Sequence, residues 1–124
     1  MESSFGEWEA ELWPMFGTTC AVLNGCDRLV EQRWESAIVA TADQLRAASR
    51  DLHGWVQGHP CPHRDFDVAL ERLGRSLEYT AATVEGMVKR GSVQWQVIDR
   101  ERRTLYVAVT QLQMMMFEQS QREP

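Results

Sequence analysis

The stretch DFDVALERLGRSLEYTAATVEGMVKRG (residues 65–91) decides the fold of this chain. Its apolar positions are separated by alternating steps of four and three residues, the spacing of a helix face that packs against partner helices. Asp65 can cap the start of such a helix, while Lys89 and Arg90 suit its negative end and Gly91 can terminate it. We therefore predict a helix over residues 65–90. The repeat consists of Phe66, Leu70, Leu73, Leu77, Thr80, Val84 and Met87.

The segment after Gly91 carries a second repeat of the same kind. Ser92 can cap a final helix, so we predict a tight reversal at Gly91-Ser92; one helix running through Gly91 is the alternative. The second half of the final helix, which contains LYVAV and MMMF, is apolar on almost every side and has to be covered on every side. If residues 114–117 are not all covered within one chain, the protein binds another chain or itself. The repeat consists of Trp95, Ile98, Arg102, Leu105, Val109, Leu112 and Met116.

Two further helices are predicted in the first half of the chain. Ser4 can cap a short helix that ends at Pro14. After Gly17, apolar positions recur at helical spacing from Leu23 to Trp55, which predicts one helix of about 35 residues, roughly 50 Å long. A helix of that length extends beyond its neighbours.

Together these elements predict an all-α fold. Short loops between helices favour an antiparallel up-down helical bundle, made of a short N-terminal helix plus three long amphipathic helices. No segment shows the two-residue alternation of a strand. The length of 124 residues suits one hydrophobic core, so we predict a single helical-bundle domain over residues 1–124.

Composition and charge exclude several classes of protein. No apolar run approaches the roughly 20 residues of a membrane-spanning helix. The net charge of -5 disfavours binding to nucleic acid or to anionic membranes, which are themselves negatively charged. The acidic N-terminus differs from a secretory signal, and three cysteines without a CxxC motif suit a reducing compartment. We therefore expect a cytoplasmic protein.

The stretch HGWVQGHPCPHRDFD (residues 53–67) gathers residues that can ligate a metal ion. Two prolines hold the backbone near polyproline geometry, in which side chains two residues apart diverge. Metal binding is therefore expected only from a pair that includes His53, and the alternative is a simple turn between two helices. The candidate metal ligands are His53, His59, Cys61 and His63.

Other chemical signals are weak. The pair Cys61-Pro62 resembles the short haem-regulatory dipeptide, which implies a thiolate ligand to iron, but we predict no cofactor from two residues. Motifs for nucleophilic catalysis and phosphate binding are absent, as is the Glu-x-x-His pairing of di-iron bundles. Glu31 and Glu35 form an i,i+4 pair that suits either a magnesium or general-base site or an exposed face. We expect a protein without catalytic activity.

Arg102 is the one charged residue within an apolar repeat. A buried cation requires a nearby negative charge, which Glu31, Glu35 or an anionic ligand could supply. The alternative is that Arg102 lies at the end of the bundle and extends to water. Arg102 is therefore the predicted ligand-binding residue.

The leading hypothesis is a non-catalytic helical bundle that acts through protein–protein contact, with itself as a homodimer or with another helical protein. The alternative is a small-ligand, metal or haem sensor that uses the His53–His63 loop and a pocket in the bundle. The predicted interface residues are Trp34, Leu105, Val109, Leu112, Met116 and Phe117.

Overall fold

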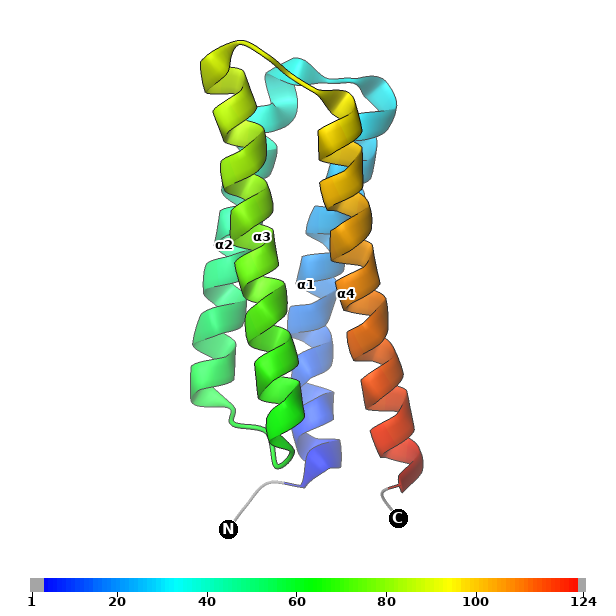
Figure 1. Ribbon diagram of the computed structural model, residues 1–124. Coiled ribbons are helices and arrows are strands. Elements are labelled where there is room, and N and C mark those ends of the chain that lie inside the picture. Colours follow the sequence, from blue (N-terminus) through cyan, green and yellow to red (C-terminus); the bar gives the residue numbers. More distant parts are fainter. Residues whose placement is uncertain (1–3, 123–124) are drawn as a thin grey trace.

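Four long helices lie side by side in the computed structural model, which describes residues 4–122 (Figure 1). The described residues contain no strand, so the predicted all-α fold is confirmed. A short 3-10 helix, η1, joins the first two helices. The bounds are α1 Phe5–Gln32, η1 Glu35–Ala37, α2 Ile38–Gly58, α3 Arg64–Arg90 and α4 Trp95–Arg122.

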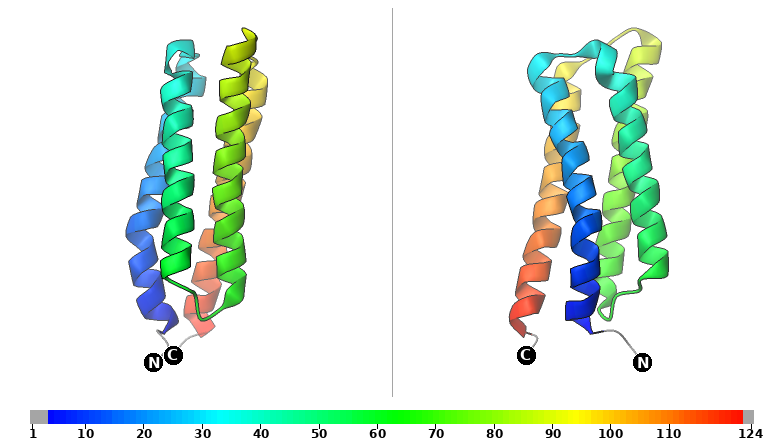
Figure 2. Two further views of the ribbon diagram at one scale, coloured as in Figure 1. Left: turned by 90° about the vertical axis from the view of Figure 1, so that its left-hand side faces the viewer. Right: turned by 180° about the vertical axis from the view of Figure 1, so that it is seen from behind.

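Consecutive helices run in opposite directions (Figures 1 and 2). The turns at residues 33–37 and 91–94 lie at one end of the bundle, and the turn at residues 59–63 lies at the other end. Each helix packs against two neighbours: α1 and α3 both contact α2 and α4, and the α2–α3 pair is the most extensive. This arrangement is the predicted antiparallel up-down bundle.

The core is built from one face of every helix. Leucine dominates it, and the polar side chains buried with it are those of threonine and serine. The α3 repeat predicted from the sequence lies in this core over its whole length, from Phe66 to Met87. The largest fully buried side chains are Phe16, Leu12, Leu23, Leu29, Ile38, Leu45, Leu52, Leu70, Leu73, Leu77, Leu105 and Leu112.

The predicted end of the first helix at Pro14 is wrong, because α1 continues through Pro14 and Gly17 to Gln32. A proline inside a helix removes one backbone hydrogen bond, here the bond to the carbonyl of Ala10. Both Pro14 and Ala10 are exposed, so water can satisfy that carbonyl. The buried face continues on the other side of the helix through Leu12 and Phe16.

The predicted helix of about 35 residues is also wrong, because the chain turns at residues 33–37. Arg33 adopts a left-handed conformation, with φ 49° and ψ 49°. Its amide donates to the carbonyl of Val30 at 3.3 Å, and the amide of Trp34 donates to the carbonyl of Leu29 at 3.1 Å. These two bonds are those of a Schellman motif, a common helix terminator. The predicted overhang of the second helix therefore does not exist.

The same terminator ends α3, as predicted at Gly91. The φ of Gly91 is 68°, its amide donates to the carbonyl of Val88, and the amide of Ser92 donates to the carbonyl of Met87, both at 3.0 Å. Glycine adopts this conformation without steric strain, whereas a residue with a Cβ atom does not. The bundle thus has one turn made with glycine and one made with arginine.

Substitutions at these two turn positions should change stability in unequal ways. Gly91→Ala is expected to lower the free energy of unfolding by about 1 kcal/mol, because alanine is strained in the left-handed region. Arg33→Gly relieves the corresponding strain at the other turn and is expected to cause no loss. Urea unfolding monitored by circular dichroism measures both. An Arg33→Gly variant that loses as much stability as Gly91→Ala would contradict this account of the turns.

Candidate protein-interaction surface

The turn between α2 and α3 is held by aromatic packing and hydrogen bonds. The ring of His59 stacks on Trp55, with centroids 4.5 Å apart and planes 8° apart. His59 Nδ1 lies 2.9 Å from the carbonyl oxygen of Trp55, which can only accept, so Nδ1 carries the hydrogen. His59 Nε2 lies 3.4 Å from the carboxylate of Glu11, and Trp8 Nε1 donates to the His59 carbonyl at 2.8 Å. The turn therefore fixes α1 against α2.

Cys61 and His63 have different partners within the same turn. The Cys61 amide donates to the Asp67 carboxylate, and the Cys61 sulfur accepts the His63 amide at 3.4 Å. Burial raises the pKa of the Cys61 thiol to about 11, so the thiol stays protonated near neutral pH. His63 Nε2 lies 3.0 Å from the side-chain nitrogen of Gln119 on α4. Cys61 and His63 therefore each have hydrogen-bond partners in other parts of the chain or in the turn itself.

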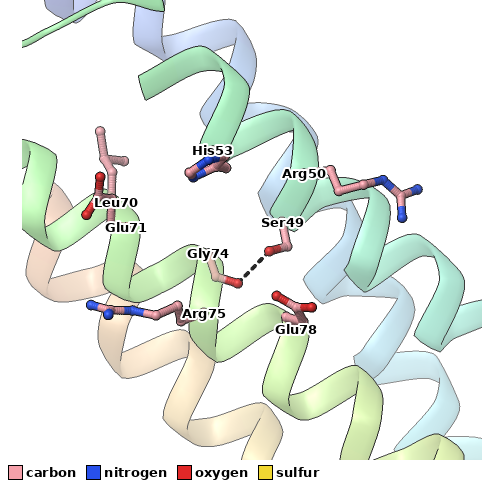
Figure 3. A pocket seen from close by; sticks show the side chains of 8 residues that line it. All are labelled: Ser49, Arg50, His53, Leu70, Glu71, Gly74, Arg75 and Glu78. Atoms are coloured by element: carbon pink, nitrogen blue, oxygen red, sulfur yellow. Dashed lines mark hydrogen bonds between the residues drawn. The ribbon is translucent and has the colours of Figure 1, made fainter. Parts of the chain in front are cut away.

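The four predicted metal ligands are divided between two places. His59, Cys61 and His63 share the turn, whereas His53 lies on the exposed side of α2 (Figure 3). Within residues 4–122, no group of three or more His, Cys, Asp and Glu side chains is arranged to hold a metal ion.

Arg102 lies between α1 and α4 and is held by two carboxylates. Its guanidinium contacts Asp27 at 2.8 Å and Asp99 at 2.6 Å, and Arg103 contacts the other oxygen of Asp99 at 2.7 Å. The hydroxyl of Tyr106 donates to Asp27 at 2.6 Å. The required negative charge thus comes from Asp27 and Asp99 instead of the expected Glu31 or Glu35. Glu31 is exposed in the last turn of α1, and Glu35 is exposed in η1 at the end of the bundle.

This network shifts the pKa values of three of its members, and that of Arg102 is raised by its hydrogen bonds to Asp99 and Asp27. The hydrogen bond from Arg102 holds the pKa of Asp99 below its ordinary value, with Arg103 adding to the effect. Burial raises the pKa of Tyr106, and together with the hydrogen bond to Asp27, which favours the protonated phenol, it brings that pKa to about 12. The network acts as a polar clamp between α1 and α4, and Arg102 is occupied by partners within its own chain.

The tyrosinate absorbance of a Tyr79→Phe variant, which retains only Tyr106, should rise with a midpoint near pH 12. Adding Asp27→Ala should lower that midpoint, because the carboxylate no longer favours the protonated phenol. A phenol whose folded pKa exceeds its unfolded value stabilises the fold below the unfolded pKa of 10.0, and that contribution is lost as pH rises toward 12. Equal midpoints with and without Asp27 would show that this hydrogen bond has no effect on Tyr106.

A groove of about 420 Å³ lies between α2 and α3 (Figure 3). Gly74 on α3 faces Ser49 on α2 within the groove, and the Ser49 hydroxyl donates to the Gly74 carbonyl at 2.7 Å. The guanidinium groups of Arg50 and Arg75 extend in opposite directions, so the charged groups do not converge on one point (Figure 3). The lining residues are Ser49, Arg50, His53, Leu70, Glu71, Gly74, Arg75 and Glu78.

The outer side of α4 presents the clearest candidate surface. Val107, Met114 and Phe117 have relative solvent exposures of 55%, 57% and 66%. Together with Thr110 and Gln121, which are also exposed, they follow one another at steps of three, four, three and four residues. We call these five residues the outer stripe. Its spacing is that of a helix face that packs against another helix.

The predicted interface residues lie in three different environments. Leu105, Val109, Leu112 and Met116 are buried in the core of their own chain, so a second chain has to contact other residues of α4. Trp34 is 52% exposed but belongs to the turn at the opposite end of the bundle from Phe117. Phe117 is the one predicted interface residue that lies in the outer stripe.

The outer stripe can also be found in the sequence, from the spacing of its residues. The steps of three and four residues run from Arg100 through Arg103 and Val107 to Gln121, parallel to the buried repeat that starts at Trp95. In this second repeat the apolar residues are Val107, Met114 and Phe117, so the helix is apolar on both sides between residues 105 and 117. The apolar segment LYVAV to MMMF is the place where both repeats coincide.

Comparisons with known proteins do not identify a relative: no family model, curated protein or solved structure matches this chain. Among residues 4–122, no helix is both long and apolar enough to cross a membrane.

Proposed function

We propose that this protein is a non-catalytic helical bundle that acts through protein–protein contact, and that it pairs with a second copy of itself through the outer stripe. One observation carries the proposal: Val107, Met114 and Phe117 are each more than half exposed on one face of one helix. Fully burying a side chain of this size contributes about 1.5–3 kcal/mol relative to leaving it in water. Covering this stripe with another chain is therefore favourable.

The neighbouring helix extends the apolar surface. Across the α1–α4 pair, Asp27 contacts Arg102 and Glu9 contacts Ser120, and this antiparallel register places Trp13 at the level of Phe117. Trp13 is 45% exposed. An apolar residue on each of two adjacent helices supports contact with a folded partner, because a single helix offers only a narrow strip.

A cytoplasmic location belongs to the same proposal. All three cysteines carry free thiols, and Cys20 and Cys61 are only partly buried. Free thiols of this kind persist in a reducing compartment, where disulfide formation is disfavoured.

Charged substitutions in the outer stripe should abolish self-association. Val107→Glu and Phe117→Glu each remove an apolar contact and place a carboxylate in the interface, at a cost of roughly 3 kcal/mol or more. We expect the dissociation constant to rise by a factor of about 100 or more. Sedimentation equilibrium over a range of protein concentrations measures this change.

Val39→Glu is the matched control, because Val39 is exposed at 47% on α2, which is not adjacent to α4. This variant should associate like the wild type. A wild-type chain that stays monomeric at high concentration, or a Val39→Glu variant that dissociates as readily as Val107→Glu, would refute the proposal.

A further inference from the structure

We infer that the two copies pair with their α4 helices antiparallel, across a two-fold axis at the level of Leu112. This inference rests on the proposed function and adds the orientation and register of the contact. It follows from how apolar and charged residues are distributed along the outer side of α4.

The charges on this face favour the antiparallel orientation. The spacing of the outer stripe continues backward to Arg103 and Arg100, both exposed, whereas Glu118 and Arg122, also exposed, lie near the other end and offset each other's charge. A parallel pair would bring Arg100 and Arg103 of both copies together. An antiparallel pair instead moves these two arginines away from their equivalents, to an end of the second copy that carries no net charge. Like charges at close range destabilise helix pairs, and opposite charges stabilise them.

The apolar residues set the register. In an antiparallel pair centred on the level of Leu112, Val107 of one copy faces Phe117 of the other, and Thr110 faces Met114. If one copy is shifted by seven residues in one direction, Met114 of one copy faces Arg103 of the other. If it is shifted by seven residues in the other direction, Val107 of one copy faces the end of the other copy's helix. The centred register alone pairs these four stripe residues with one another, so it buries the most apolar surface.

The same register gives a role to Trp13. Within one chain, Trp13 lies at the level of Phe117. In the centred register Val107 of the second copy faces that Phe117, so Trp13 lies beside this contact. A contact along residues 103–121 is about 27 Å long at 1.5 Å per residue, and one such helix pair lies at the low end of stable interface sizes. Trp13 from each copy widens the contact, and the two-fold axis closes it as a dimer.

Distances between spin labels test the orientation directly. The background variant has Cys20, Cys26 and Cys61 replaced by alanine, and its helicity and its mass in solution are first compared with those of the wild type. A single cysteine for the label is then introduced at Gln121 or at Gln111, both of which are exposed. Labels at position 121 lie nine residues from the axis, so we expect a separation of about 30 Å, made of roughly 27 Å along the helices plus their lateral spacing. Labels at position 111 lie near the axis and should be close in either orientation.

The possible results separate a wrong orientation from a wrong choice of surface and from the absence of a dimer. A dimer with a separation of about 10 Å at position 121 is parallel, which overturns the inference and leaves the proposed function standing. A dimer with distant labels at position 111 uses another surface and overturns both. The absence of any dimer for the wild-type chain refutes the proposed function itself.

Discussion

A helix in a four-helix bundle buries one face and leaves the opposite face in water, and this constraint governs the whole molecule. α1, α2 and α3 each set one buried stripe against the shared core and leave only scattered large apolar residues exposed, among them Trp13, Val39 and Tyr79. α4 has apolar residues on two faces, of which the bundle can cover one. Leu105, Leu112 and Met116 are buried, while Val107, Met114 and Phe117 remain exposed. The proposed pairing covers this second face.

The inner surfaces of the bundle are already engaged. Arg102, the charged residue of the buried α4 repeat, is held by Asp27 and Asp99, and Tyr106 is bonded to Asp27. The histidines of the 59–63 turn contribute to packing, with His59 stacked on Trp55. Every buried side-chain nitrogen and oxygen within residues 4–122 has a hydrogen-bond partner. The candidate contact with a partner that we propose therefore lies on the surface, in the outer stripe.

The helix class and the packing faces could be read from the sequence, but the position of one turn could not. Steps of three and four residues identified the buried faces of α3 and α4, and Gly91 marked the end of α3. At residue 33 the same Schellman turn is made with arginine, so the usual glycine signal is missing. The apolar spacing does change near Val30, but a change of spacing alone does not mark the end of a helix. Pro14 predicted a helix end that does not occur, because the hydrogen bond that this proline removes lies on the exposed side of α1.

The candidate site was less accessible to prediction. Sequence spacing shows that Arg102 interrupts an apolar repeat, but only the register between α1 and α4 shows that Asp27 faces it. In the same way, the apolar segment at residues 114–117 predicted a contact with another chain, yet the choice between buried Met116 and exposed Phe117 depends on how α4 is rotated against the core.

Native mass spectrometry of freshly purified wild-type protein tests the central claim most directly, because one spectrum reports both the number of chains and any retained ligand. The proposed function predicts a two-chain species whose mass is twice that of the polypeptide, without added metal, haem or small molecule. A species of one chain at every concentration, or one whose added mass identifies a bound ligand, would contradict it.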